Sequence, residues 1–502
     1  MKILDCTLRD GGYYTKWDFD SKFVEAYIKY INKMPVEYIE IGYRSPEKGE
    51  YMGEYFYLPL STIKNIKSNT SKKLSIMLNL KDCKIEHIEN LLLDLVDVVT
   101  LIRIAIDPKN IEYGILLAKK IKILGFEVAF NIMYISKIKD NDHFFSYLTK
   151  IESIIDYLYL VDSYGSIYPN KLKKLIRKIN KLTPINLGFH GHNNIELAFI
   201  NSLEAINNGC VIIDSTILGM GRGAGNLKTE LLLVHLKNYS NLAVDLNILG
   251  NLVELFIKLS VSYQWGTNLA YMVSGSYSLP QKEVMEALGI NRYSLSGIVN
   301  QVKSDYELIL PRFIFNIKNK NVDCLIVGGG DSVEKHFLFI QEYLNANKEI
   351  IIIHSSSRHV KLFENLNNIQ FLSIAGDELL KINTAMSINS YILQPRPRKI
   401  NNPLQNKDRF YELESIDFID HYFDSPLTIS FQVALDINAD QIYLVGFDGY
   451  KELKTKKELY LMQENQKILD SFQRHRKVIT LTDSKYKNIL RQSIYGKIYH
   501  GH

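Results

Sequence analysis

Short hydrophobic runs alternate with longer amphipathic segments through the first 230 residues of the chain. Eight of these runs have the length and composition of buried strands: Lys2–Cys6, Glu37–Gly42, Leu74–Asn79, Val98–Ile104, Glu127–Met133, Tyr157–Asp162, Ile185–His190 and Val211–Ser215. Between them, apolar residues recur at helical spacing in Ser21–Lys33, Ile111–Leu124, Asn170–Leu182 and Ile195–Asn208. The pattern predicts eight β-strands separated by helices.

This alternation favours a (β/α)8 barrel. Parallel strands need long crossover connections, which helices supply, and eight such units in about 230 to 280 residues fit a TIM barrel. A doubly wound open sheet is the alternative. Polar residues that we expect to end the predicted strands, or to follow them directly, favour the barrel, because they would meet at one mouth. These residues are Arg9, Asp10, Glu40, Asn79, Arg103, Asn131, Asp162, His190, His192 and Asn226.

The rest of the chain predicts more than one domain, since 502 residues exceed what one core usually organises. We place the barrel at residues 1–280, with an irregular stretch at Tyr263–Pro280, and a helical extension or linker at 281–318. Beyond it, further strands are expected at Cys324–Val327, Glu349–His354, Ile369–Ile374, Tyr391–Leu393 and Gln441–Val445. They predict a second, open α/β domain over 319–502.

Composition narrows the class of protein. The formal charge of +5 is the small difference between 60 basic and 55 acidic residues, so it gives no argument for nucleic-acid binding. No apolar stretch approaches the roughly 20 residues that span a bilayer. The four cysteines are widely separated, which is typical of reduced thiols. We expect a cytoplasmic enzyme without a membrane span, and a homo-oligomer.

The segment His190-Gly191-His192 is the strongest chemical signal. Side chains two apart on a strand share a face, so both imidazoles would point the same way. With Asp10, they form a mixed oxygen and nitrogen ligand set for a divalent ion, Mn²⁺ or Mg²⁺ before Zn²⁺ or Co²⁺. Each residue also has an ordinary structural role open to it. A buried histidine can be a hydrogen-bonded core residue, and an aspartate before two glycines can be a turn residue.

Open coordination positions on such an ion suit a 2-oxo acid. Its ketone and carboxylate can chelate the metal, which then lowers the cost of forming an enolate at the adjacent carbon. Arg9 would stabilise the developing oxyanion, unless it is only an ion-pair partner.

Further polar residues complete the predicted site. The glycine-rich loop Gly219–Asn226 lets the backbone pass close to a ligand, and Asn226 is either a fourth metal ligand or part of a tight loop. Arg103, Asn131 and Asp162, with Ser163 after it, are the predicted substrate-binding residues.

Four motifs, in the same order, resemble the DRE-TIM metallolyases. They are Leu8-Arg9-Asp10-Gly11, Asp162-Ser163-Tyr164-Gly165, His190-Gly191-His192-Asn193-Asn194 and Gly219–Asn226. That superfamily includes 4-hydroxy-2-oxovalerate aldolases, hydroxymethylglutaryl-CoA lyases, and isopropylmalate and homocitrate synthases. The resemblance covers about residues 1–280. It implies a metal held by Asp10, His190 and His192, with Arg9 stabilising an enolate, and it is most similar to the aldolase branch.

The chain departs from the aldolase branch at one catalytic position. That branch has a histidine, its presumed general base, shortly after the Arg-Asp-Gly motif, where this chain has Tyr13. An unperturbed tyrosine is a poor base at neutral pH. We therefore expect Tyr13 to donate a proton to an aldol alkoxide or to position substrate. Glu40 and Tyr43 are further candidates.

The second domain has its own motif. Gly328-Gly329-Gly330 follows a predicted strand and precedes a predicted helix, an arrangement that can bind a phosphate. With Ser425–Ala434 and the run that ends in Asp448, it is similar to Rossmann-like surface-glycan proteins related to motility accessory factors and sialyltransferases. That distant resemblance implies a nucleotide or nucleotide-sugar ligand contacted by Gly328, Gly329, Gly330 and Asp448. The alternative is a structural domain that caps the barrel.

Together these features predict a metal-dependent aldolase acting on a 2-oxo acid, with pyruvate the simplest choice. The acceptor would be an aldehyde or sugar, and the second domain places the reaction in surface-polysaccharide synthesis. Two alternatives stay open: a Claisen-type acyl-CoA condensing synthase, and an inactive barrel that serves as a binding scaffold.

Overall fold

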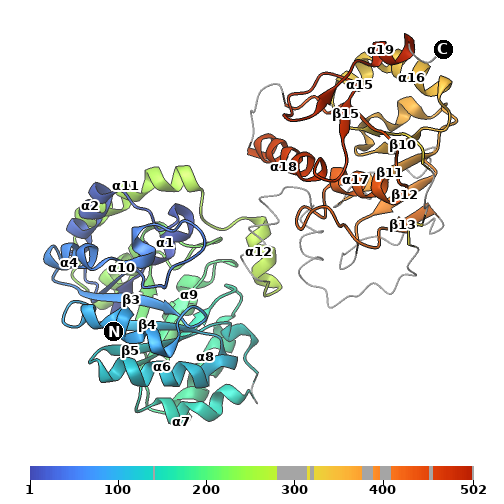
Figure 1. Ribbon diagram of the computed structural model, residues 1–502. Helices are drawn as coiled ribbons and strands as arrows, with labels where there is room; N and C mark the ends of the chain where they lie inside the picture. The colour runs from blue at the N-terminus through green and yellow to red at the C-terminus, as the bar shows by residue number, and fades with distance from the viewer. Residues whose placement is uncertain are drawn as a thin grey trace. The chain divides into compact units, whose positions relative to one another are not determined.

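The computed structural model describes residues 1–139, 142–279, 314–316, 321–375, 388–395, 409–450 and 456–499. The chain separates into two compact units, Met1–Met285 and Glu286–His502 (Figure 1). Of the predicted linker at 281–318, only 314–316 lies within the described residues.

The first unit is a closed barrel of eight parallel strands, which confirms the predicted TIM barrel and excludes the open sheet. The strands follow one another around the barrel in chain order, and β1 pairs with both β2 and β8. Their bounds are β1 Lys2–Asp5, β2 Tyr38–Tyr43, β3 Lys73–Asn79, β4 Leu101–Ile106, β5 Glu127–Ile132, β6 Tyr157–Asp162, β7 Leu187–Gly191 and β8 Cys210–Ser215.

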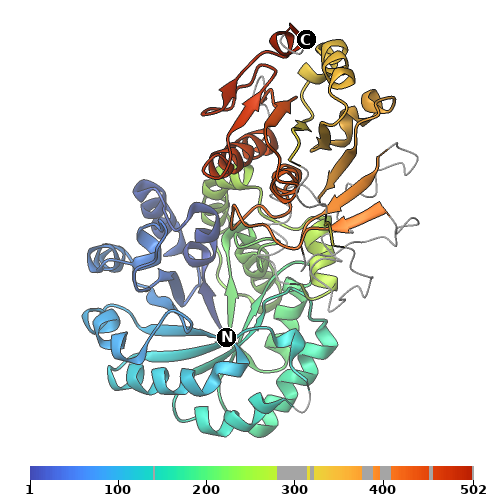
Figure 2. The ribbon, with the colours of Figure 1, turned by 45° about the vertical axis from the view of Figure 1, so that its right-hand side comes forward.

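Helices surround these strands on the outside (Figure 2). The longer ones are α1 Thr7–Thr15, α2 Ser21–Ile31, α4 Leu60–Ser68, α6 Ile111–Ile123, α8 Pro169–Leu182, α9 Ala198–Asn207, α10 Thr229–Ser240, α11 Leu246–Tyr263 and α12 Leu269–Ser276. The shorter ones are α3 Glu54–Tyr57, α5 Ile88–Leu92 and α7 Leu148–Ile151. Helix α12 lies in a stretch whose glycines and polar residues predicted irregular structure.

Successive side chains of each strand point to opposite sides of the barrel wall and so form two separate cores. One set of strand side chains packs against the helices. The other fills the barrel interior, where a smaller cluster includes Leu4, Tyr38, Leu101, Ala129, Tyr159 and Ile212. Glu40 and Arg103 lie two residues after Tyr38 and Leu101, so they share the inward face. Both are in the middle of their strands, although the sequence placed them at strand ends.

The second unit has an eight-stranded, wholly parallel sheet in the order β13-β12-β11-β10-β9-β14-β15-β16. The strands are β9 Cys324–Val327, β10 Ile351–His354, β11 Gln370–Ile374, β12 Ser390–Leu393, β13 Phe410–Glu412, β14 Ile442–Val445, β15 Val478–Thr480 and β16 Leu490–Arg491. The expected α/β architecture is present, and its assignment as Rossmann-like stays a prediction.

Helices cover both faces of this sheet. They are α15 Ser332–Lys335, α16 Phe337–Ala346, α17 Pro426–Asp436, α18 Lys456–Phe472 and α19 Ile494–Tyr499. Cys324 and Ile326 pack in the core that contains residues of α17 and α18, whereas Leu325 and Val327 pack in the core of α16 and α19. Successive residues of β9 thus point to opposite faces, and both faces are buried.

None of the helices in the described ranges combines the length and apolar character needed to cross a bilayer. All four cysteines are buried and free, as expected for reduced thiols.

Candidate active site

The predicted metal ligands come together at the mouth of the barrel. Asp10 lies in the first turns of α1, directly after β1, while His190 is in β7 and His192 follows it. Oδ2 of Asp10 lies 3.5 Å from Nε2 of His190, and the rings of His190 and His192 are 5.0 Å apart. Residues from two distant parts of the sequence therefore meet in one small, buried volume.

The two histidines present ring nitrogens that suit a metal ion. Burial first, and then the charge of His190, lower the pKa of His192 to about 3, so its ring is neutral near pH 7. Its Nδ1 is buried without a hydrogen-bond partner among the described residues. Such orphaned atoms are uncommon in protein interiors and fit a site for a cation.

Asn226 joins this group from the glycine-rich loop. Its side-chain amide donates to Oδ2 of Asp10 over 2.7 Å, and its backbone forms an isolated bridge with His192. Oδ1 of Asn226 is buried with no partner in the described part of the chain. A Cβ at Gly221 would lie 2.5 Å from Nδ2 of Asn226, so glycine is required there for the loop to close over the site.

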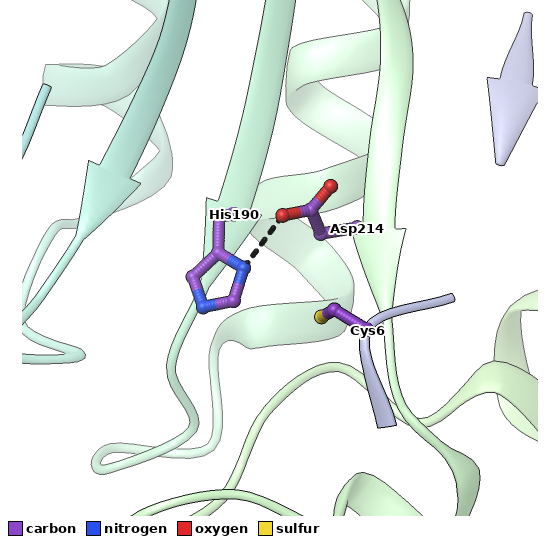
Figure 3. Close-up of side chains that lie close together, drawn as sticks. All are labelled: Cys6, His190 and Asp214. Carbon is purple, nitrogen blue, oxygen red and sulfur yellow. Dashed lines mark hydrogen bonds and ion pairs between the residues drawn. The ribbon is translucent and has the colours of Figure 1, made fainter. Parts of the chain in front are cut away.

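His190 is oriented by a residue that the sequence argument missed. Its Nδ1 lies 2.8 Å from Oδ2 of Asp214 in β8, and Figure 3 shows this contact with Cys6 nearby. Asp214 could have been found from the sequence, because it is a carboxylate inside the otherwise apolar run Val211–Ser215.

Cys6, His190 and Asp214 also lie close enough together to hold a metal ion. The contacts favour Asp10 over this set. Burial raises the pKa of the Cys6 thiol well above its ordinary value, so the thiol is protonated in the metal-free protein. Asp214 is already engaged by His190 and by the guanidinium of Arg103.

Five buried charged groups form a continuous network around the candidate ligands. Arg9 contacts both Asp10 and Glu40, and Arg103 contacts both Glu40 and Asp214. Burial alone would raise the pKa of Asp10, but Arg9 and the histidines outweigh it and hold that pKa below its ordinary value. Three carboxylates and two guanidiniums leave one net negative charge. Buried charge calls for compensation, so the network itself favours a bound cation.

The predicted substrate-binding residues are occupied by contacts within the protein. Arg103 is fully buried, with its Nε 3.2 Å from Oδ1 of Asn131 and its guanidinium 4.1 Å from the ring centre of Tyr159. Asp162 accepts hydrogen bonds from the amides of Ser166 and Ile167, and Ser163 accepts one from the amide of Tyr134. The geometry favours positioning roles for all four predicted residues.

Glu40 is likewise a positioning group by its contacts. Its Oε2 lies 2.7 Å from Nε of Arg9 and 3.1 Å from Nη1 of Arg103. A carboxylate held between two guanidiniums fixes their planes.

Tyr13 lies where the site opens to solvent. Its side chain is 38% exposed, and its hydroxyl is 3.2 Å from that of Tyr43. Burial raises the pKa of Tyr43 well above its ordinary value, so Tyr43 keeps its proton. The pair can therefore hold a proton at the mouth of the barrel.

In the second unit, Asp448 follows β14 and lies against the turn Gly328–Gly330 that was predicted to bind phosphate. It accepts hydrogen bonds from the amide of Ser332, over 2.9 Å, and from the Ser332 hydroxyl. A Cβ at Gly330 would lie 2.5 Å from Cγ of Asp448. The predicted contacts Gly328, Gly329, Gly330 and Asp448 thus lie together, with an internal carboxylate beside the loop amide.

Comparison with known proteins places the barrel in a family. Residues 104–255 match the family model described as HMGL-like. The crystal structure of the N-terminal domain of a proposed aldolase from Bacteroides vulgatus is 51% identical, with a TM-score of 0.58. The match covers 60% of this chain and 99% of that structure.

This chain belongs to the HMGL-like family, the DRE-TIM metallolyases.

Curated relatives are more distant. An oxaloacetate decarboxylase from Mycobacterium tuberculosis is 27% identical over 256 residues, 49% of this chain and 73% of that protein. A 4-hydroxy-2-oxovalerate aldolase from Geobacillus thermodenitrificans is 28% identical over 265 residues, 50% of this chain and 74% of that protein. The superfamily resemblance of the barrel is thus confirmed.

Proposed function

We propose that the barrel is a divalent-metal-dependent carbon–carbon lyase that makes or breaks a bond next to the ketone of a 2-oxo acid, pyruvate being the simplest case. The observation that carries this proposal is the meeting of Asp10 with His190 and the neutral ring of His192. The curated relatives support it, because they are named for reactions of oxaloacetate and of 4-hydroxy-2-oxovalerate, both 2-oxo acids.

The metal would be held by Asp10, His190 and His192, with Asn226 beside them, as Mn²⁺ or Mg²⁺. When bound, the ion would supply Lewis acidity towards the ketone and carboxylate oxygens of the 2-oxo acid. Asp214 fixes the His190 ring so that Nε2, and not Nδ1, faces that position.

Arg9 acts on the charge that develops as the C3 proton leaves. Glu40 and Asp10 each hold one edge of its guanidinium. A cation fixed in this way needs no reorganisation when an enolate forms beside it.

Tyr13 acts in the later step, in which the new carbon–carbon bond forms. When the C3 carbon attacks an aldehyde, the carbonyl oxygen becomes an alkoxide and must gain a proton. The exposed hydroxyl of Tyr13, backed by Tyr43, can donate that proton, while water takes the C3 proton.

The test is exchange of the C3 protons of pyruvate in D₂O, which needs no acceptor. We expect exchange with added Mn²⁺, its loss with excess chelator, and its loss in Asp10→Asn. Asp18→Asn is the matched control, because Asp18 lies eight residues away on the exposed surface. If the wild type shows no exchange with Mn²⁺, the lyase proposal is refuted in favour of a barrel that serves as a binding scaffold.

For the second unit we propose a Rossmann-like role, the binding of a nucleotide or nucleotide-sugar for surface-polysaccharide synthesis. Its sheet supports this, since the strand order reverses at β9, whose neighbours are β10 and β14. Ligands of such sheets bind outside the carboxyl ends of the strands at that reversal, where Gly328 and Gly446 begin the loops. Titrating the full chain with CMP, CDP and UDP tests it, and the absence of heat with all three would refute it.

A further inference from the structure

Arg222 is a cation of the barrel loop that the proposed chemistry does not use. It lies in Gly219–Asn226, which runs from the end of β8 to the Asn226–Asp10 contact. The loop is fixed at Arg222 and directly after it, because Gly225 donates to the carbonyl of Arg222 and Tyr14 donates to that of Gly223. Its backbone position is therefore well defined.

The guanidinium of Arg222 faces the opening of the site. It lies 5.3 Å from the ring centre of Tyr13. Its charge also opposes the rise that burial causes in the pKa of Tyr134, just beyond β5, and contributes after burial and His190 to the low pKa of His192. Arg222 is thus close to residues from three sides of the mouth.

Unlike the two arginines beneath it, Arg222 has no acidic partner. Arg9 and Arg103 each contact two carboxylates. Within the described ranges, no carboxylate forms an ion pair with Arg222, and its Nε is a buried donor without an acceptor. A buried donor is normally satisfied, so a ligand that carries an acceptor is the natural partner.

The net charge of the site indicates which of the two substrates Arg222 binds. The buried network carries one net negative charge, which a divalent ion changes to one net positive charge. The carboxylate of a 2-oxo acid then neutralises the centre. The positive charge of Arg222 is left over, and it matches an anionic group on the second substrate.

We propose that Arg222 binds the carboxylate or phosphate of an anionic aldehyde acceptor, which makes it the residue that selects the acceptor class. This inference rests on the proposed lyase function. The C3 carbon of the enolate forms a bond to the aldehyde carbon, and the electron pair of the aldehyde π bond moves to its oxygen, which gains a proton. Arg222 binds only the distal anion, and no oxidant or reductant is needed.

The test compares matched acceptors with pyruvate and Mn²⁺. Succinic semialdehyde is paired with butanal, and glyceraldehyde 3-phosphate with glyceraldehyde, so that the two pairs separate carboxylate from phosphate recognition. The readout is the ratio of kcat/KM for the anionic member to that for the neutral one. We expect a ratio of about 10 or more for at least one pair in the wild type.

Arg222→Gln should lower that ratio about 10-fold or more, and Arg222→Lys should restore part of it. Lys228→Gln, which removes an exposed charge two residues beyond the loop, should leave it unchanged. Because the measure is a ratio within one variant, loss of folded protein does not affect it.

Failure of this inference is distinguishable from failure of the lyase function. If pyruvate exchanges its protons but every ratio is near one, or if Arg222→Gln keeps the wild-type ratio, the role of Arg222 is refuted. The same holds if exchange occurs and no anionic aldehyde is turned over. If exchange itself is absent, the lyase function has failed first.

Discussion

Nδ1 of His190 lies 2.8 Å from Oδ2 of Asp214, while Nε2 of the same ring lies 3.5 Å from Oδ2 of Asp10. Although burial opposes it, Arg103 and His190 hold the pKa of Asp214 below its ordinary value. Asp214 is therefore an acceptor, and the proton of the ring resides on Nδ1. The lone pair of Nε2 is left facing Asp10, as a metal ligand requires.

Asp214→Asn should weaken Mn²⁺ binding about 10- to 100-fold, because the ring loses the partner that fixes its tautomer. Calorimetric titration with Mn²⁺ measures the change. Asp5→Asn is the matched control: Asp5 is also buried beside the barrel mouth, but it contacts Thr7, Tyr27 and Thr229 and no histidine. Equal Kd values for wild type and Asp214→Asn would contradict the account.

Arg103→Met should destabilise the fold by about 3–5 kcal/mol, because it leaves the buried carboxylates of Glu40 and Asp214 without their shared cation. Urea unfolding followed by circular dichroism measures this. The same change at exposed Arg177, whose Nε contacts Oδ1 of Asn208, should cost far less. Similar losses in both variants would show that the network is not a stabilising element.

The low pKa of His192 predicts an acid-sensitive metal-free protein. The unfolded chain takes up a proton on this ring as the pH falls below about 6.5, whereas the folded state resists until about pH 3. Protonation therefore favours unfolding, and the stability is full above pH 6.5 and lost as the pH falls. With chelator present, His192→Gln should lose less Tm between pH 7.5 and pH 5 than the wild type. Parallel Tm curves would refute a depressed pKa.

Tyr13→Phe should lower aldol turnover about 100-fold, since the alkoxide loses its proton donor. Proton exchange at C3 of pyruvate should fall much less, because Tyr13 acts after the enolate has formed. Tyr51→Phe is a suitable control, as its exposed hydroxyl donates to Asp18 at the surface. If exchange and turnover fell together, Tyr13 would act in enolate formation instead.

The barrel could be predicted from the sequence because its strands are short, apolar and separated by helices. Tyr157–Asp162 was predicted with its observed bounds, whereas β4 begins at Leu101 and not at Val98. Glu40 and Arg103 were misplaced at strand ends, because an inward polar residue within an apolar run looks like the end of that run. That the barrel interior contains charged side chains is evident only once the strands close into a barrel and these residues point inward.

The candidate ligands were predictable because their spacing carries the chemistry. How their partners meet was not predictable, since Asp214 in β8 and Arg103 in β4 contact each other across the barrel interior, from strands that are not paired. The short strands β15 and β16 and the helix α12 were missed for a different reason. Each is too short for its periodicity to be recognised, with eight residues in α12, three in β15 and two in β16.

The proposed chemistry depends most on which side chains hold the ion. Anomalous diffraction from crystals soaked in Mn²⁺ tests this directly. We predict one peak within about 2.0–2.3 Å of Asp10, His190 and His192, with Asp214 bound only to the far side of the His190 ring. A peak coordinated by Cys6 and Asp214, or no peak in the barrel, would contradict it.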